Sequence, residues 1–342
     1  MTPPDLEAPE QPAAGAPDPG RLEQAILAVL TGAPAHRTAR QAAVTPVALA
    51  AAARAYQQAG RATLASITGA AGTWKQVIVE FSGWDTAEHA AATALAPRLQ
   101  DPAVTAGWWF IRKYPHWRIR YRPATAAAPA RERVGGILNE LTDAGQIRGW
   151  RDGIYEPETL AFGGSAGMAI AHDLFCADSL GVLAVFGQAL SAGASRPAGR
   201  KELSLLLCSA LMRSAGLDWF ERGDAWHRVT SLRPPALMAT QSHHEAVKAL
   251  LTADMTPASP MLAPGGPLAS VAAWAEAFRQ AGQFFGAAAA EGQLHRGLRD
   301  VLAHLIIFHW NRIGLTAASQ TILARTARDV IMNTTIGIAG SH

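Results

Sequence analysis

The chain has 342 residues, 49% of them hydrophobic, which is enough to build the core of one large domain or of two smaller ones. Its formal net charge is only +3 at pH 7, too weak to indicate nucleic-acid binding. The two cysteines, Cys176 and Cys208, stand far apart in apolar runs, which excludes a disulfide framework and a cysteine-based zinc site. They are expected to be buried thiols of a cytoplasmic protein.

The chain begins with a segment, residues 1–20, that is rich in proline, alanine and acidic residues and is predicted to be a disordered tail. It has no basic or apolar region of the kind found in signal peptides, and no membrane-spanning helix is expected anywhere in the chain. Residues 21–66 show helical periodicity, with Thr45 as a helix N-cap and Pro46 at the first helical position. This segment is a small helical cap on the main domain or, alternatively, a helix-turn-helix.

Strands are predicted early in the remaining chain and helices late, a pattern that indicates an α+β fold in which helices pack on an antiparallel sheet. The helix-rich part is expected to occupy the second half. The expected strands cover residues 74–81, 107–123 (a β-hairpin with Pro115 in its turn) and 147–158. The expected helices cover residues 84–100, 130–146, 167–190 (as two segments), 201–217 and most of the chain after about residue 270. Between these helices we expect a break at 223–235, a loop at 233–247 and a linker at 256–267.

The predicted hairpin contains the sequence YPHWRIRYR. Because side chains alternate between the faces of a strand, Arg118, Arg120 and Arg122 should share one face. Such a row of like charges requires carboxylate partners or an anionic ligand. Glu156 and Glu158, in the sequence GIYEPETLAFGG, are candidate partners.

Common sequence motifs for nucleotide, zinc and hydrolase chemistry do not occur in the chain. The glycine-rich sequence FGGSAG, residues 162–167, lacks a lysine and indicates a tight backbone turn and not a phosphate cradle.

A second informative stretch is LRDVLAHLIIFHWNRIGL, residues 298–315, which predicts a helix buried almost all round. Its polar members include His304, His309, Asn311 and Arg312, and each of them needs a partner if it is buried. Two interpretations are open. The four side chains form a structural hydrogen-bond network, or they line a pocket in which an imidazole moves protons.

Three stretches, WWFIRKYPHWRIRYRP, IYEPETLAFGG followed by HDLFCADS, and FHWNRIGL, occur in the order and spacing seen in the elimination domains of lantibiotic dehydratases. Residues 74–335 therefore resemble such a domain. The resemblance implies a protein that acts on ribosomally made peptides. Family members remove a glutamyl group from modified serine or threonine and leave a dehydroamino acid.

The chain departs from the family pattern at two positions. A family arginine falls on Ala161, and a family histidine falls on Ile307. Neither an alanine nor an isoleucine can stabilise an anion or take up a proton, which counts against glutamate elimination. The chain looks like a stand-alone pyridine synthase of thiopeptide biosynthesis, a relative that joins two dehydroalanines of one peptide in a formal [4+2] aza-cycloaddition. The macrocycle that forms is aromatised by loss of water and of the leader peptide.

This resemblance implies a set of site residues and a ribosomal precursor peptide, carrying azoles and dehydroalanines, as substrate. It implies no cofactor, metal, nucleic acid or membrane, and a homodimer is possible. A glutamate-eliminating lyase and a non-catalytic peptide- or DNA-binding regulator remain as alternatives. The implied catalytic residues are His304, His309 and Tyr155, and the implied substrate-binding residues are Arg112, His116, Arg118, Arg120, Trp109, Phe162, Gly163, Asn311 and Arg312.

Overall fold

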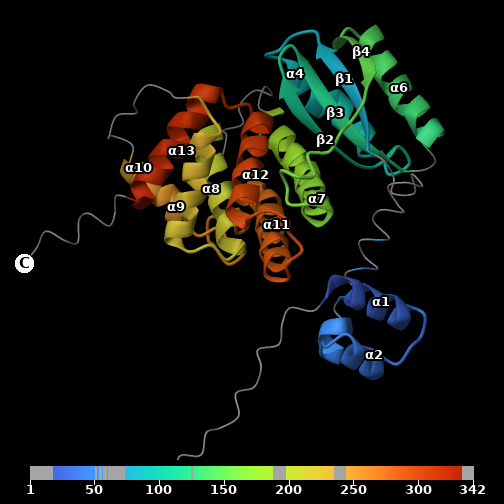
Figure 1. Cartoon of the computed structure of the whole chain (residues 1–342). Coiled ribbons are helices and arrows are strands. Elements are labelled where there is room, and N and C mark those ends of the chain that lie inside the picture. The colour runs from blue at the N-terminus through green and yellow to red at the C-terminus, as the bar shows by residue number, and fades with distance from the viewer. Residues whose placement is uncertain are drawn as a thin grey trace, which may run out of the picture. The chain divides into compact units, whose positions relative to one another are not determined.

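The computed structural model describes residues 18–50, 52–53, 56, 60, 74–124, 127–187, 198–234 and 244–332. The chain divides into two compact units, residues 1–71 and 72–342, which are drawn in Figure 1. Most of the expected disordered tail, residues 1–17, lies outside the described residues.

The first unit is a small helical bundle with its own core. Helix α1 (Pro19–Leu30) includes the last two residues of the expected tail, because Asp18 caps it by accepting a hydrogen bond from the backbone of Arg21 at 3.2 Å. Helix α2 (Ala35–Gln41) follows, and then helical residues 46–50. The predicted cap of this last segment is confirmed, since the backbone N–H of Ala48 donates to Thr45 Oγ1 at 3.1 Å.

The second unit contains a four-stranded antiparallel sheet with the strand order β2-β3-β1-β4, which confirms the predicted α+β class. The expected hairpin forms, and its turn contains Pro115 after a cis peptide bond. Proline is tolerated there because it does not have to donate a hydrogen bond to a neighbouring strand. The strands are β1 (Lys75–Phe81), β2 (Thr105–Lys113), β3 (His116–Pro123) and β4 (Ile147–Gly153).

The two faces of the sheet differ in character. On one face Val77 lies opposite Ile119 and Val79 lies opposite Trp117, and helix α6 (Ala127–Asp143) covers this apolar face beside β3 and β4. On the other face Arg120 lies between Trp109 of β2 and Gln76 of β1. Helix α7 (Ser165–Val182) packs on β2, so α6 and α7 lie on opposite sides of the sheet (Figure 1).

Two helical runs of this unit contain π-helical turns. The segments α4 (Ala87–Ala90), η1 (Ala91–Leu95) and α5 (Ala96–Leu99) are continuous, and α7 continues into η2 (Leu183–Gly187). The prediction of two separate segments in 167–190 is therefore wrong for the described residues, which end at 187. The π turns η1 and η2 touch each other, and His89 donates a hydrogen bond to the carbonyl of Gly187 at 3.0 Å.

The second half of the unit is helical, as expected, with one correction. Residues 223–235 were expected to break the helical part, but α9 (Trp219–Ser231) runs through most of them. A capping box starts this helix, because Asp218 and Glu221 accept hydrogen bonds from each other's backbone N–H. The expected loop 233–247 ends in helix, since its last four residues belong to α10. The other helices are α8 (Arg200–Ser214), α10 (His244–Thr252), α11 (Ala272–Ala290), α12 (Leu298–Ile313) and α13 (Ala317–Met332), with a short 3₁₀ turn at Ala269–Val271.

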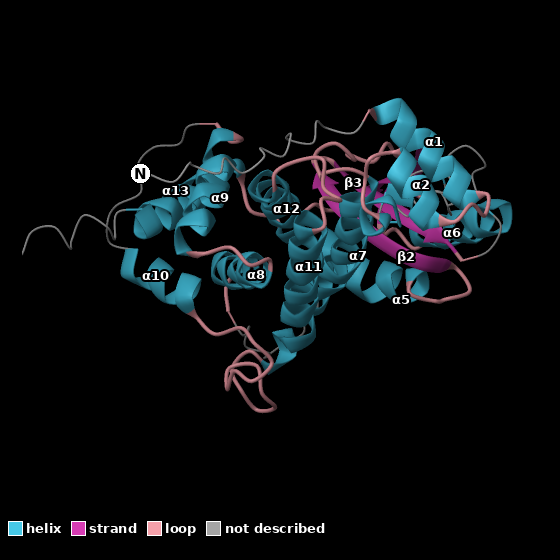
Figure 2. Cartoon of the chain, turned by 60° about the horizontal axis from the view of Figure 1, so that its bottom comes forward, coloured by secondary structure: helices cyan, strands magenta, loops and turns pink. Residues whose placement is uncertain are grey.

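Helix α7 joins the sheet to this helical layer. It contacts β2 on one side and α11 and α12 on the other, an arrangement that Figure 2 shows. The run Ser165–Gly187 is long and apolar enough to cross a membrane by length and composition, with a mean hydropathy of 1.6 and 44% of that window buried. Because the run packs on three neighbours, its apolar character is that of a core helix.

Candidate active site

A buried charge network joins α7, α11 and α12. The carboxylate of Asp178, which is fully buried, accepts hydrogen bonds from Trp274 Nε1 at 2.9 Å and from His309 Nδ1 at 2.9 Å, and it forms an ion pair with Arg312. Burial alone would raise the pKa of Asp178, but His309 and Arg312 outweigh it and hold this pKa below its ordinary value. The carboxylate is therefore ionised and binds three helices together.

The same network closes the outer edge of strand β2. Arg312 Nε donates to the carbonyl of Phe110 at 3.0 Å, and the backbone N–H of Phe110 donates to Ser179 Oγ at 3.1 Å. His309 and Arg312 are 2% and 0% exposed, so neither lies at a surface that a peptide can reach. This position favours the structural interpretation of the two residues.

A second ion cluster fixes the end of α12 to the sheet. The carboxylate of Glu88 pairs with both Arg112 and Arg200. Arg112 Nε donates to the carbonyl of Arg312 at 2.8 Å, and Arg200 donates to the carbonyl of Ile313 at 2.6 Å. Arg112 is thus engaged within the fold and not directed at a substrate.

A different group of side chains lies where the segment after β4 crosses α7. Here the Tyr155 hydroxyl and His172 Nε2 share a hydrogen bond of 2.8 Å, and the imidazole lies 4.6 Å from the Trp74 ring. Burial, followed by the charges of Arg120 and Arg122, lowers the pKa of His172 to about 4. Burial raises the pKa of Tyr155 above its ordinary value. Both groups are therefore neutral at pH 7, and both are only partly buried.

Arg120 lies beside this pair. Its guanidinium stacks 4.3 Å from the Trp109 ring and 4.6 Å from the Tyr155 ring, and its Nε donates to Gln76 Oε1 at 2.9 Å. Burial lowers the pKa of Arg120 to about 10, so the group stays charged at pH 7. The Nη1 atom of Arg120 and the Oε2 atom of Glu158 are buried and have no hydrogen-bond partner. Arg120 and Glu158 interact through their charges without a direct ion pair.

Aromatic rings form a wall next to the pair. Phe175 lies 4.7 Å from Trp109 and stacks 5.2 Å from Phe308, which in turn meets Phe162 edge-on at 5.1 Å. The predicted tight turn follows Phe162 and is confirmed, since Gly163 and Gly164 have φ values of +80° and +104°.

The structure distributes the sequence-predicted residues over several places. Tyr155, Arg120, Trp109 and Phe162 lie together. Gly163 follows Phe162 in the wall. Two of the other residues are bound within the helical layer: His304 Nδ1 donates to the Asp300 carbonyl at 2.9 Å, and Asn311 accepts from Gln320 at 3.0 Å. The remaining two lie on the sheet. His116 Nε2 is 3.8 Å from Glu80, and Arg118 is half-buried on the polar face.

Sequence reasoning missed His172, Gln76 and Trp74 as members of the site. His172 stood in the quoted sequence HDLFCADS, where a histidine next to Asp173 inside an apolar helix was the available signal. The contacts of the other two depend on strand pairing. Among the described residues, no group of three or more histidine, cysteine, aspartate or glutamate side chains is placed to hold a metal ion.

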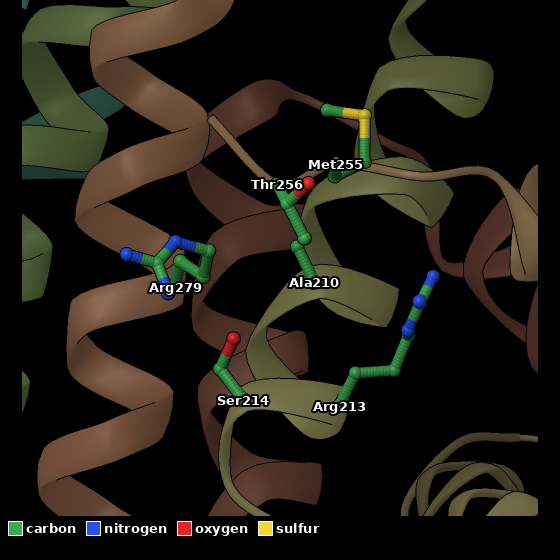
Figure 3. A pocket seen from close by; sticks show the side chains of 6 residues that line it. All are labelled: Ala210, Arg213, Ser214, Met255, Thr256 and Arg279. Atoms are coloured by element: carbon green, nitrogen blue, oxygen red, sulfur yellow. The ribbon is translucent and has the colours of Figure 1, made fainter. Parts of the chain in front are cut away.

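A cavity of about 210 Å³ lies elsewhere, where α8, α11 and residues 255–256 meet (Figure 3). Its two arginines are already engaged, because Arg213 donates to the carbonyl of Ala253 at 2.8 Å and Arg279 binds Glu276 with both Nε and Nη2. The cavity offers no reactive side chain, and the candidate active site is the Tyr155–His172 pair with its surroundings.

Comparisons with known proteins show a matching family and several similar structures. Residues 74–331 match the family described as lantibiotic biosynthesis dehydratase C-term. The chain is similar in structure to the tRNA-dependent lantibiotic dehydratase MibB from Microbispora sp. 107891, with a TM-score of 0.58 and 19% identity over 79% of this chain and 29% of MibB. It is also similar to TbtD, a pyridine synthase from thiomuracin biosynthesis, with a TM-score of 0.50 and 16% identity over 78% of this chain and 99% of TbtD. The chain spans less than a third of the length of MibB. No curated protein sequence matches the chain.

Proposed function

Because the chain belongs to the family of lantibiotic biosynthesis dehydratase C-terminal domains, we propose that it acts on a ribosomally made precursor peptide that contains dehydroalanines. The more specific proposal is a pyridine synthase that joins two dehydroalanines by a formal [4+2] aza-cycloaddition. Two C–C bonds form between the carbon ends of the azadiene and the alkene of the second dehydroalanine, water leaves, and the leader peptide leaves as an amide when the ring becomes aromatic.

The observation that carries this proposal is the neutral Tyr155–His172 pair. The reaction requires a peptide amide to act as an iminol, so a proton has to move from the amide nitrogen to its oxygen. A hydroxyl and an imidazole that are both uncharged and hydrogen-bonded can accept one proton and supply another. The low pKa of His172 keeps the imidazole free to accept at neutral pH.

Arg120 supports the same step. Its guanidinium is 4% exposed and lies 4.6 Å from the Tyr155 ring, so its charge acts from behind the pair on negative charge that develops there. Phe308 is the partly exposed ring of the aromatic wall and can meet a flat azole ring of a modified peptide, while Trp109, Phe175 and Phe162 support it from the core. Holding both dehydroalanines together supplies the larger part of the catalysis, since proximity alone can contribute about 7–11 kcal/mol.

The substitutions at Ala161 and Ile307 favour cyclisation over glutamate elimination. Ile307 is 8% exposed and packs in the core, so it cannot serve as an acid or a base. The positive charge of Arg120 beside the pair is the observation in favour of the alternative, because it can also attract a glutamyl carboxylate.

Mass spectrometry of peptides incubated with the purified chain tests both candidates. A precursor with two dehydroalanines should yield a macrocycle lighter than the substrate by water and the whole leader amide. A glutamylated peptide should stay unchanged. Loss of glutamate from the second peptide, with no change in the first, would replace cyclisation by elimination.

A further inference from the structure

The two edges of the sheet are not equivalent. The outer edge of β2 is closed at Phe110, whose N–H and carbonyl groups are both bound by side chains. Strand β4 forms the other edge, and among the described residues its only hydrogen-bonded neighbour is β1. In an antiparallel edge strand every second residue directs its N–H and carbonyl groups outward, where another strand can pair with them.

A hollow lies beside β4 on the face covered by α6. It has a volume of about 430 Å³ and is lined by Trp150 of β4 and by Gly135, Gly136 and Asn139 of α6, with Arg131 and Glu132 at one end. A methyl group on Gly135 would lie 3.3 Å from the Trp150 indole, so this glycine lets the indole lie close against the helix. Trp150 Nε1 donates to Asn139 at 2.9 Å, which fixes the ring. The floor is apolar and suits a large apolar side chain.

A second hollow lies beside β4 on the opposite face. It has a volume of about 170 Å³ and is lined in part by Ile78, His116 and Arg151. Ile78 of β1 is flanked in register by Arg118 of β3 and Arg151 of β4. Neither arginine has an ion-pair partner among the described residues, whereas Glu80 in the same hollow is engaged by Arg148 at 3.2 Å. This hollow therefore suits a carboxylate side chain.

We propose that β4 binds an extended acidic segment of the peptide substrate as a fifth strand of the sheet. Added strands obtain affinity from main-chain hydrogen bonds and specificity from pockets that take alternate side chains. Here the two hollows lie on opposite faces of one edge strand, so the bound segment has an alternating pattern, with acidic residues toward Arg118 and Arg151 and apolar residues toward Trp150. The unpaired charges of the two arginines select a peptide that is acidic.

The position of this edge connects it to the candidate active site. Strand β4 ends at Gly153, two residues before Tyr155. Gln76 binds both Arg120 Nε, at 2.9 Å, and the carbonyl of Ile154, at 3.0 Å. A peptide held along β4 therefore has one end beside the Tyr155–His172 pair. The identity of the occupant as substrate depends on the function proposed above.

Fluorescence anisotropy with the full chain tests the added strand directly. The probe is a fluorescein-labelled hexapeptide of alternating glutamate and phenylalanine, together with two analogues that are N-methylated at all glutamates or at all phenylalanines. Only one of these two sets of three N–H groups can face β4. One analogue should therefore bind about 150-fold more weakly, for three lost hydrogen bonds of about 1 kcal/mol each, and the other should bind nearly as the parent does. Equal affinities of the two analogues would overturn the proposal.

Two variants assign the site. Arg151→Ala should weaken binding about 2–5-fold, as expected for a partly solvated charge pair, and Arg98→Ala, an exposed arginine on α5, should leave it unchanged. In cyclisation of a precursor, Arg151→Ala should raise KM and leave kcat unchanged. Peptide binding without any cyclisation would refute the proposed reaction and support the proposed peptide-binding site along β4. A homodimer in sedimentation that Arg151→Ala dissociates, with no peptide binding, would assign β4 to a second copy and overturn the proposal.

Discussion

Replacing Asp178 with asparagine should destabilise the larger unit strongly. The substitution preserves the shape of the side chain but leaves the buried guanidinium of Arg312 with neutral acceptors and no negative charge beside it, while its Nη2 atom is unpartnered already. An uncompensated buried charge of this kind costs about 3–5 kcal/mol. For a domain of this size, each kcal/mol lowers Tm by about 2–4 °C, so a loss of about 6–20 °C is expected.

The assay is urea unfolding at pH 7, followed by the fluorescence of the ten tryptophans. Asp173→Asn is the matched control, because Asp173 lies on the same helix and is exposed. It should change the free energy of unfolding by less than about 0.5 kcal/mol. The double variant Asp178→Asn with Arg312→Met should recover part of the loss, since it removes both charges.

The pH dependence provides a further check. The pKa of Asp178 is lower in the folded chain than its ordinary value of 3.8, so the ion pair contributes fully above that pH and is lost as the pH falls through the folded-state value. The difference between the wild type and Asp178→Asn should therefore shrink below about pH 3.8. Additive effects of the two substitutions in the double variant would refute the account of a coupled buried pair.

Three other predictions concern the site and the turn beside it. Tyr155→Phe and His172→Gln should each lower the single-turnover rate of cyclisation about 10²–10³-fold without changing the melting temperature, and unchanged rates would exclude the pair from catalysis. The wild-type rate should fall only as the pH approaches the His172 pKa of about 4. Arg120→Met should move this decline to higher pH, because it removes a charge that lowers the pKa of His172. An unchanged pH profile in the variant would refute the electrostatic coupling between Arg120 and His172. Gly163→Ala should cost about 1–2 kcal/mol in chemical denaturation because φ is +80° there, whereas Gly136→Ala, in an open helical position, should be stabilising.

Local patterns in the sequence were sufficient for most elements of the fold. The alternation in YPHWRIRYR placed Arg120 on one face of a strand, and the hairpin register then set it opposite Trp109. The start of helix α9 also has a local signal, since Asp218 and Glu221 form a capping box five residues before Gly223, where the expected break begins. This signal favours a helix in place of the break expected at 223–235.

The candidate site was only partly predictable for a physical reason. Tyr155 was identified, but its partner His172 lies on a helix whose packing against β4's continuation is set by tertiary contacts. The pairing of Glu88 with Arg200 joins residues that are 112 positions apart, and no local pattern links them. The functional interpretation of His309 depended on whether Asp178 lay within reach, and this contact spans 131 positions.

The two touching π turns affect how this fold can change in evolution. Each π turn accommodates one residue more than an α-helical turn, and loss of that residue would rotate everything after it on the helix by about 100°. The contact between them also requires Gly187, since a methyl group at this position would lie 2.3 Å from the side chain of Ala92. A single-residue deletion in either helix would thus misalign the interface on both sides. Descendants of this chain should keep both insertions or lose them together.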